Sequence, residues 1–462
     1  PNDNLKWWTL GVVGAGTFMS AIDGSVVNTA LPVIQRQTGA PVSTAVWVVL
    51  IYLLTVSSSL LIFGRLADIY GHRMFYIGGM AVFVIGSLLC GFSRNIGLLI
   101  VFRAFQGFGA AALFALGPAI LTGAFPGQER GKALGMQATF TYLGLATGPS
   151  VGGLITQHLG WPWIFFINIP IGILVILAAI RVLQSNEHNV RRPFDIIGAI
   201  TLALTLIALI FGIDSGARYG WESLIILASL ITAGIALLVF IAAENRTDDP
   251  LVDLSLFRNR VFSASTVAAL LNYMATSSDS ILMPFYLVSA RGFRVDNAGY
   301  ILVATPLTMA IVASWSGAIS DKIGQRLPAT IGMAITVTGI LLLRTLSPIS
   351  PWWEIVMHLV LIGFGIGLFT SPNNSAIMGS APRNRQGVAG AILAASRNIG
   401  FVFGTALATI IYTTRLASFP PKISSSVAIT SAMQQATTIV ALVASIGIVI
   451  SAIRGRVGRN EQ

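Results

Sequence analysis

The chain is a succession of long apolar stretches separated by short polar segments. A transmembrane helix needs about 20 predominantly apolar residues, whereas a barrel strand needs about half as many and alternates in polarity. The pattern therefore predicts membrane-spanning helices rather than strands. The predicted spans, fourteen in number, cover residues 7–31, 44–65, 74–93, 96–122, 131–157, 161–182, 194–214, 221–243, 261–288, 295–319, 327–347, 352–378, 386–412 and 434–454.

Composition supports this interpretation. Hydrophobic residues make up 55% of the 462 positions and charged residues only 10%, compared with about 25% charged in soluble domains. A soluble core could not bury so much apolar surface, so we place the chain in a bilayer. The net charge of +11 lies mainly in the short loops, which does not indicate a nucleic-acid partner.

No chemistry-bearing cluster is evident. Cys90 is the single cysteine, and the four histidines have no ligand spacing, so we predict no disulfide, no metal site and no cofactor. There is no Ser/His/Asp arrangement and no nucleotide-binding loop, so an enzyme is not expected. The first apolar stretch is too long for a cleavable signal peptide.

The distribution of Lys and Arg predicts the orientation. With the N-terminus inside, eighteen of the 28 basic residues fall in inner segments and eight in outer segments. The excess predicts that both termini are cytoplasmic and that the number of spans is even. The basic tail from Arg454 onward is expected near anionic lipid headgroups.

A polar turn occurs twice, at residues 64–73 and 317–326, in the frame Gly-x-x-x-Asp-x-x-Gly-x-Arg. Two copies 253 residues apart predict two related halves. The second glycine of each frame suits a positive φ at a tight reversal. In each copy the aspartate ends one helix and the arginine begins the next, so both have the wrong sign for their own helix dipoles. We interpret them as partners for other segments; the alternative is a solvated polar turn. The residues concerned are Gly64, Asp68, Gly71, Arg73, Asp321 and Arg326.

The repeat defines the expected domain organisation. Residues 1–190 are predicted to form one six-helix bundle and residues 261–462 a second. Residues 191–260 would contribute two inserted transmembrane helices and an inner linker. The Ser-rich stretch 413–433 predicts a long exposed outer loop.

Ionisable residues inside spans are costly in hydrocarbon and therefore mark functional positions. Asp23, Arg103, Asp279 and Arg397 lie well inside the predicted spans. Asp23 and Asp279 are 256 residues apart and each lies about four residues beyond the middle of its span, so the two acids have matching depths. Arg103 could reach the depth of Asp23, and competition between burial and a nearby guanidinium suits an acid that takes up and releases a proton. The alternative is a static pair that joins two helices. Arg397 could either bind an anionic group or pack against a neighbouring helix, and the sequence does not decide between these two roles.

Small residues favour close helix contacts in the predicted span at 131–157. They permit either plain packing or a bend that allows rocking. The positions are Gly144, Gly148, Pro149, Gly152 and Gly153.

Several of these motifs together resemble the major facilitator superfamily, in particular its fourteen-span drug:proton antiporters. The turn at 64–73 is similar to the superfamily's loop signature, and residues 98–111, with Arg103, to its proton-coupling motif. Residues 144–153 resemble the antiporter signature, while 22–32, 163–170 and 194–198 are similar to segments of fourteen-span exporters. The basic residues after Gly71 are fewer than is usual in the family.

The resemblance implies an all-α polytopic membrane protein with two six-helix bundles, a two-helix insertion and alternating access to a central cavity. It also implies that Asp68 and Asp321 help to close an inner gate. Export of hydrophobic, often cationic compounds in exchange for protons is the implied activity.

We therefore expect a proton-coupled multidrug exporter in the plasma membrane. Its partners would be an amphipathic small molecule, protons and membrane lipid, with no nucleic acid, and the protein would act as a monomer. Proton coupling is assigned to Asp23, Arg103 and Asp279. Candidate substrate-binding residues are Asp23, Asn28, Tyr52, Phe140, Asn272, Tyr273, Asp279, Tyr286 and Arg397. The alternatives are a lipid exporter on the same fold, motivated by Arg397 and the inserted helices, and a membrane scaffold that transports nothing.

Overall fold

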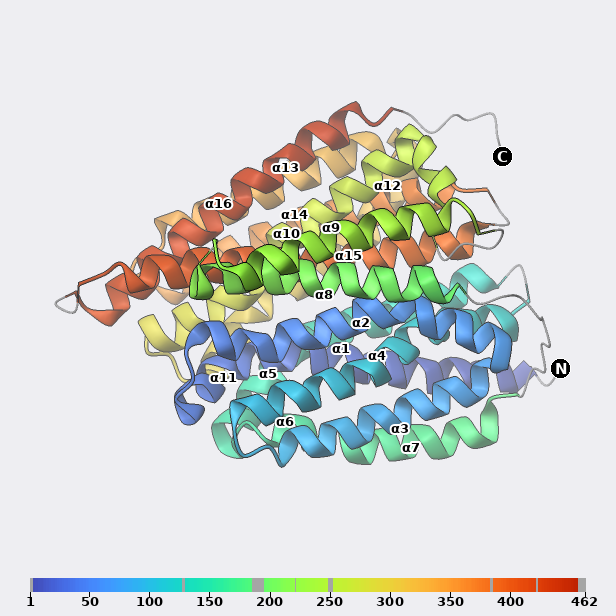
Figure 1. Ribbon diagram of the computed structural model, residues 1–462, viewed down its shortest axis with the longest axis horizontal. Coiled ribbons are helices and arrows are strands. Elements are labelled where there is room, and N and C mark those ends of the chain that lie inside the picture. The colour runs from blue at the N-terminus through green and yellow to red at the C-terminus, as the bar shows by residue number, and fades with distance from the viewer. Residues whose placement is uncertain are drawn as a thin grey trace. The chain divides into compact units, whose positions relative to one another are not determined.

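The computed structural model consists of long helices joined by short connections (Figure 1). It describes residues 3–126, 129–184, 195–220, 222–247, 252–382, 385–420 and 423–455. Predicted linker residues such as Arg191 and Arg192, and the tail beyond Gly455, lie outside this part of the chain.

The helices follow the predicted spans closely. Those before the linker are α1 (Asp3–Thr38), α2 (Val42–Tyr70), α3 (His72–Gly91), α4 (Ile96–Ala124), α5 (Arg130–His158), α6 (Trp163–Phe166), α7 (Asn168–Val182), α8 (Ile196–Tyr219) and α9 (Leu224–Glu244). Those after it are η1 (Leu254–Arg258), α10 (Arg260–Phe285), η2 (Tyr286–Ala290), α11 (Val295–Leu302), α12 (Ala304–Ile323), α13 (Arg326–Leu342), η3 (Leu343–Thr345), α14 (Trp352–Gly379), α15 (Gln386–Ala417) and α16 (Ser425–Ile453).

Twelve helices in the described part of the chain are long and apolar enough to cross a membrane. The predicted spans at 131–157 and 261–288 are not among these twelve. Their helices, α5 and α10, are rich in Gly, Ser and Thr, which lowers their hydropathy. The all-α polytopic fold is confirmed, and the count of fourteen spans stays a prediction.

Some details differ from the sequence-based expectation. The span predicted at 161–182 is divided between α6 and α7, and the span at 295–319 between α11 and α12. The long outer loop predicted at 413–433 is wrong, because α15 continues to Ala417 and α16 already begins at Ser425. Serine and threonine in this stretch donate to carbonyls of their own helices, as Thr413 Oγ1 does to Thr409 O, which suits polar residues in apolar helices.

The chain forms two compact units, residues 1–203 with 294–300, and residues 204–293 with 301–462. Each unit uses the same scheme of helix pairs. In the first unit α4 packs between α2 and α3, and α1 packs on α5 and α7. In the second unit α14 packs between α12 and α13, and α10 packs on α15 and α16. The two halves therefore share one packing pattern, while the predicted domain boundaries stay a prediction.

The repeated turns have the expected geometry. Gly71 (φ 105°) separates α2 from α3, and Gly324 (φ 86°) ends α12 just before α13. A positive φ at these positions favours glycine because a Cβ atom would clash with the backbone. Asp68 lies in the last turn of α2, and Arg73 is the second residue of α3.

Glycine also sets the closest helix contacts in each unit. A methyl group on Gly109 of α4 would lie 2.6 Å from the carbonyl oxygen of Gly79 of α3. A methyl group on Gly365 of α14 would lie 2.9 Å from the carbonyl oxygen of Gly332 of α13. Both contacts require small residues on both helices, as is common in membrane bundles.

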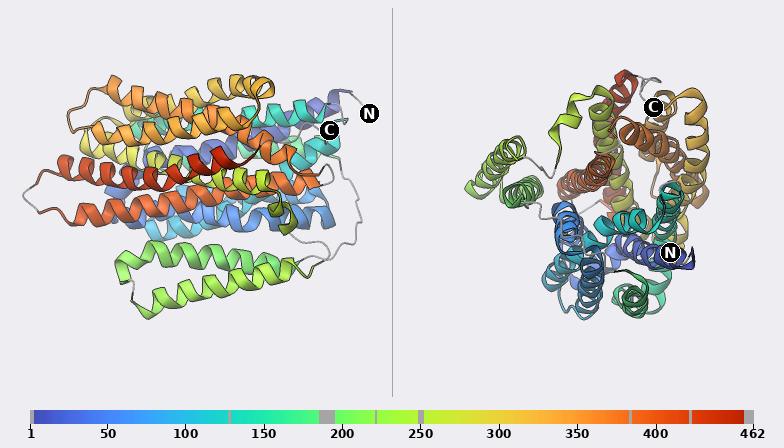
Figure 2. Two further views of the ribbon diagram at one scale, coloured as in Figure 1. Left: turned by 90° about the horizontal axis from the view of Figure 1, so that it is seen from above. Right: turned by 90° about the vertical axis from the view of Figure 1, so that its right-hand side faces the viewer.

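The inserted helices α8 and α9 lie side by side as a hairpin (Figure 2). Ser229 Oγ of α9 donates a hydrogen bond to the carbonyl oxygen of Ala208 of α8 at 2.6 Å. At its beginning α8 is capped by Asp195, whose Oδ1 accepts from the Gly198 amide at 2.8 Å. This contact explains the residues Asp195 and Gly198 that the sequence analysis singled out.

We predict that Gly109→Ala destabilises the protein by about 1–3 kcal/mol, because the added methyl group overpacks the contact between α3 and α4. Gly78→Ala is the matched control, since a methyl group there meets no atom within 4 Å. Thermal unfolding in detergent should show a lower Tm for Gly109→Ala only. Equal Tm values for the two variants would contradict the packing account.

Candidate functional site

Asp23 is the centre of a buried polar network in the first unit. Its Oδ2 accepts from Arg103 Nη1 at 2.6 Å. Its Oδ1 accepts from Gln106 Nε2 at 2.9 Å and from Asn168 Nδ2 at 2.8 Å. Ser87 Oγ accepts from the same two amides, at 2.7 Å from Gln106 and 3.3 Å from Asn168. Both oxygens of Asp23 are therefore occupied by N–H donors.

Arg103 is enclosed on the remaining sides. Its side chain is fully buried, its Nε donates to the carbonyl oxygen of Val48 at 3.2 Å, and its Nη1 also donates to Gln106. The guanidinium carbon lies 4.0 Å from the ring centroid of Tyr52 and 5.6 Å from that of Phe165. A buried ion pair is favourable only when most of its remaining donors and acceptors are also used. Nε and Nη1 are used here, whereas Nη2 has no hydrogen-bond partner among the described residues. Cation–π contacts with the two rings contribute further.

The network joins four helices: Asp23 belongs to α1, Ser87 to α3, Gln106 to α4 and Asn168 to α7. The break between α6 and α7 makes Asn168 the first residue of α7. The sequence analysis predicted that Arg103 would reach Asp23, and the structure brings the two together. It missed Asn168 and Ser87 as partners, although Asn168 lies in the stretch 163–170 that carried part of the resemblance.

Asp279 of α10 has a different environment in the second unit. It is 3% exposed, yet no hydrogen bond or ion pair joins its carboxyl group to any residue that the structure describes. The neighbouring hydroxyls are already used, since Ser277 donates to Met274 O and Ser278 donates to Ala275 O. The two acids occupy matching helices, but only Asp23 has polar partners.

The other candidate residues of α10 and η2 are spread along the helix. Asn272 is fully buried and its Nδ2 donates to Met333 Sδ at 3.2 Å. The ring of Tyr273 packs on that of Phe401 of α15, with centroids 5.7 Å apart. Tyr286 is buried and donates its hydroxyl to Ser347 O at 2.7 Å, so this contact holds the connection after α13.

Arg397 of α15 lies in the interior of its helix and is half-buried. Within the described ranges its guanidinium has no hydrogen-bond acceptor, carboxylate or aromatic ring as a partner. The two interpretations of Arg397, binding an anionic group and helix packing, both stay open.

Two further candidates lie on α1 and α5. Asn28 is half-buried and its Oδ1 has no hydrogen-bond partner in the described part of the chain. Phe140 packs on α1, where a methyl group on Gly14 would lie 2.6 Å from the ring. Neither residue belongs to the network around Asp23.

The glycines of α5 pack its backbone on α1. Methyl groups on Gly144 and Gly152 would lie 2.7 and 2.8 Å from the carbonyl oxygens of Phe18 and Val26, and Gly148 faces Ser25 between them. Gly153 faces α11 instead. The helix runs through Pro149 without a break, so close packing accounts for the glycines, and a gating bend stays a prediction.

Of the turn residues predicted to gate the protein, Asp68 makes a local contact and Arg73 contacts another segment, α7. Asp68 Oδ1 lies 3.1 Å from His72 Nε2, and Arg73 Nη2 donates to the carbonyl oxygen of Ile180. Gly64 has open space around its Cα, and Arg326 is exposed. The side chain of Asp321 lies outside the described set. The gating role of these residues stays a prediction.

The fold and the buried ionisable residues define a polytopic membrane protein of the transporter type. The family model of the Major Facilitator Superfamily matches residues 13–405. The chain is 36% identical to the riboflavin transporter RibZ of Clostridioides difficile, covering 96% of this chain and 97% of that protein. It is 31% identical to the multidrug resistance protein Stp of Mycobacterium tuberculosis over 86% of this chain and 74% of that one. A crystal structure of the peptide transporter POT in complex with sulfate has the same fold, with a TM-score of 0.70, 16% identity and coverage of 97% and 96%.

The chain belongs to the major facilitator superfamily. Members of this family are transporters and not enzymes, so the protein is a membrane transporter, in agreement with the lack of a catalytic constellation in the sequence.

We predict that Arg103→Met lowers the free energy of unfolding by about 3–5 kcal/mol, because it leaves a carboxylate buried without its charged partner. Adding Asp23→Asn should restore part of the loss, since the amide has no charge to compensate. Thermal unfolding of the two variants and the wild type measures both effects. A stable Arg103→Met variant, or no recovery in the double variant, would contradict the account of the network.

Proposed function

We propose that the protein is a proton-coupled antiporter that exports hydrophobic, often cationic compounds by alternating access. The observation that carries the proposal is the unpartnered, buried carboxyl group of Asp279 in the interior of α10. An ionisable group is costly at such a position and is retained where it serves transport. A carboxyl group whose oxygens are free can bind either a proton or a cationic cargo.

The two acids would then have different roles. Protonation of Asp23 would disrupt contacts with Arg103, Gln106 and Asn168. Protonation of Asp279 disrupts no contact that the structure describes. Asp279 is therefore the better candidate for the group that exchanges its proton, and the Asp23–Arg103 pair holds the first unit together and couples to that exchange.

The cargo class rests on chemistry and on relatives. A cationic amphiphile is recognised by a carboxylate together with aromatic surface, and Asp279 lies on the same helix as Tyr273, which packs on Phe401. A relative that covers most of the chain is named a multidrug resistance protein, and another a riboflavin transporter. A flavin is therefore a second compound to be tested in the same assay.

The orientation and location are part of the proposal. The excess of Lys and Arg in alternate loops favours cytoplasmic termini. We propose a location in the plasma membrane and outward movement of the cargo, in line with the relative that is named a multidrug resistance protein. One proton that moves down a potential of 100 mV yields about 2.3 kcal/mol, which is enough to concentrate an uncharged cargo roughly fiftyfold. Exchange of one proton for one monovalent cation moves no net charge, so the pH gradient alone drives the export of such a cargo.

We predict that Asp279→Asn abolishes substrate-evoked proton movement, because the amide cannot exchange a proton. Proteoliposomes with an imposed pH gradient and a fluorescent pH probe would be exposed to ethidium or to riboflavin. Wild-type protein should dissipate the gradient when one of these compounds is added. Glu222→Gln, a substitution of an exposed acid between α8 and α9, should behave as the wild type.

Proton movement by Asp279→Asn at the wild-type rate would remove Asp279 from the coupling step. No response of the wild type to any cargo would favour a scaffold over an antiporter.

A second candidate function is export of a lipid or another anionic amphiphile on the same fold. The half-buried guanidinium of Arg397, which has no partner among the described residues, favours it. Vesicles that contain a fluorescent anionic lipid distinguish the two functions. Lipid movement that is lost in Arg397→Gln, without ethidium movement, would support this candidate; ethidium movement alone would refute it.

A further inference from the structure

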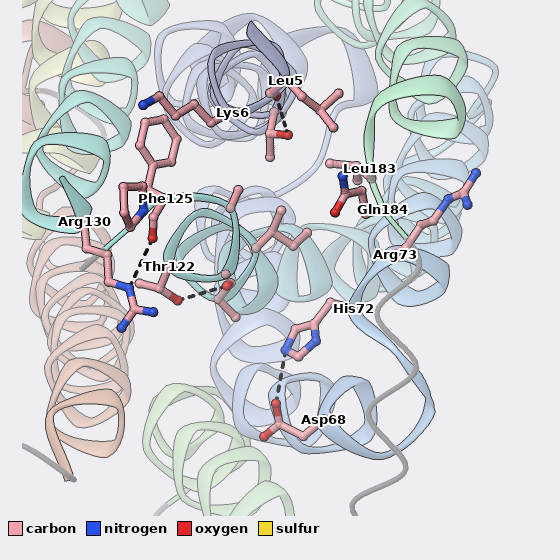
Figure 3. Close-up of a pocket in the computed structure, with 16 residues that line it drawn as sticks. Leu5, Lys6, Asp68, His72, Arg73, Thr122, Phe125, Arg130, Leu183 and Gln184 are labelled. Carbon is pink, nitrogen blue, oxygen red and sulfur yellow. Dashed lines mark hydrogen bonds and ion pairs between the residues drawn. The ribbon is translucent and has the colours of Figure 1, made fainter. Parts of the chain in front are cut away.

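The first unit contains a cavity of about 810 Å³ apart from the Asp23 network (Figure 3). Two of its lining residues, Asp68 and Arg73, belong to the turn with the predicted gating role. The cavity lies where α1 begins, where α4 and α7 end, and where Gly71 connects α2 to α3. All of its lining residues belong to this one unit. The cavity is far from the Asp23 network along each helix, since Asp23 lies more than four turns from Leu5 on α1.

The charged residues around the cavity are mostly basic. Lys6 Nζ is paired with Glu129 Oε2 at 2.9 Å, and His72 is paired with Asp68 at 3.1 Å. Two guanidinium groups remain, Arg73 and Arg130, and they lie on opposite sides of the cavity (Figure 3).

Neither of these guanidinium groups has an acidic partner. Arg73 donates to the carbonyl oxygen of Ile180, and Arg130 Nε donates to that of Phe125 at 3.4 Å. Neither forms an ion pair with any carboxylate in the described part of the chain. The lining therefore retains two guanidinium groups that no carboxylate of the described residues compensates.

The equivalent place in the second unit, at the end of α16, is occupied by the side chain of Arg454. Arg454 is the residue after α16, and Leu183 is the residue after α7. The two helices have equivalent positions, because α16 packs on α10 and α13 as α7 packs on α1 and α3. Arg454 is 1% exposed and fills its corner, where Nη1 donates to Asn373 Oδ1 at 3.0 Å and lies 3.4 Å from Ser265 Oγ. Burial and, to a smaller extent, the charge of Arg326 lower the pKa of Arg454 to about 10.

The first unit has a leucine at that position and an open cavity instead. Thr9 lies in its lining, 256 residues before Ser265, which is also the spacing between Asp23 and Asp279. The two equivalent positions thus differ in the residue that follows the last helix of the unit, Leu183 in one and Arg454 in the other. The wall of the cavity combines Leu5, Ile120, Phe125 and Leu183 with the basic groups, which suits a ligand that has an apolar part as well as a charge.

We propose that this cavity binds the phosphate group of an amphiphile, either an anionic lipid headgroup or a free phosphate ester, through the guanidinium group of Arg73 or that of Arg130, which border it on opposite sides. Guanidinium groups bind phosphate through charge-assisted, often bidentate hydrogen bonds. The apolar wall would receive the glycerol or acyl portion that adjoins the phosphate. Occupancy would join the ends of α1, α3, α5 and α7 around one ligand.

The test uses the purified full chain in a neutral detergent and isothermal titration calorimetry. The three probes are dioctanoylphosphatidylglycerol, glycerol 3-phosphate, and dioctanoylglycerol, which lacks the phosphate. We expect the phosphate-bearing lipid to bind at least about tenfold more tightly than dioctanoylglycerol. The double variant Arg73→Gln/Arg130→Gln should bind this lipid about tenfold or more weakly, since neither guanidinium group remains to donate to the phosphate.

Two control proteins make the result specific. Arg94→Gln, which removes an exposed guanidinium after the opposite end of α3, should bind as the wild type does. Arg73→Lys/Arg130→Lys keeps the charge and should retain part of the affinity, and it remains informative if the glutamine variant does not fold. If glycerol 3-phosphate binds as tightly as the lipid, the ligand is a free phosphate ester; if only the lipid binds, it is a headgroup.

Equal affinity for the lipid with and without its phosphate would overturn the proposal. So would undiminished binding by a folded glutamine variant, or equal losses in Arg94→Gln and the double variant.

Discussion

A carboxylate inside an apolar bundle requires hydrogen-bond donors that replace the water it has lost. The first unit meets this requirement at Asp23 with donors from α4 and α7. These helices, with α3 through Ser87, must therefore keep a fixed register relative to α1. The small residues of α4 suit the same constraint, because helices that share a buried network have to approach closely.

The second unit repeats the scaffold without repeating the network. The contacts of Gly332 with Gly365 reproduce those of Gly79 with Gly109, yet Asp279 has no polar partner in the described part of the chain. The corners at the ends of α7 and α16 differ in the same way, one open and one filled by Arg454. The two units thus provide similar frames whose polar residues differ. The proposed division of roles, with Asp23 structural and Asp279 exchanging a proton, rests on this asymmetry.

Most of the architecture could be predicted from the sequence because long apolar stretches leave the backbone few alternatives to helix. The turn glycines could be predicted from the repeated frame. The pairing of Asp23 with Arg103 could be predicted from the depth of each residue along its helix. Asn168 was not identified as a partner because its placement depends on the break before α7. Pro170 is a local signal for such a break, but it does not show which side chain then meets Asp23. The stretch at 413–433 was misjudged because serine and threonine are common in loops but are also tolerated within apolar helices, where they donate to their own carbonyls. The cavity beside Arg73 and Arg130 could not be predicted, because it depends on how side chains such as Leu183 pack at the ends of several helices.

The central claim is that Asp279, and not Asp23, releases a proton when cargo binds. The most direct measurement is substrate-induced proton release from purified protein in weakly buffered detergent solution, followed with a pH indicator as ethidium is added. The account predicts release by the wild type and by any folded Asp23→Asn variant, and none by Asp279→Asn. Release that persists in Asp279→Asn and disappears in a folded Asp23→Asn would contradict it.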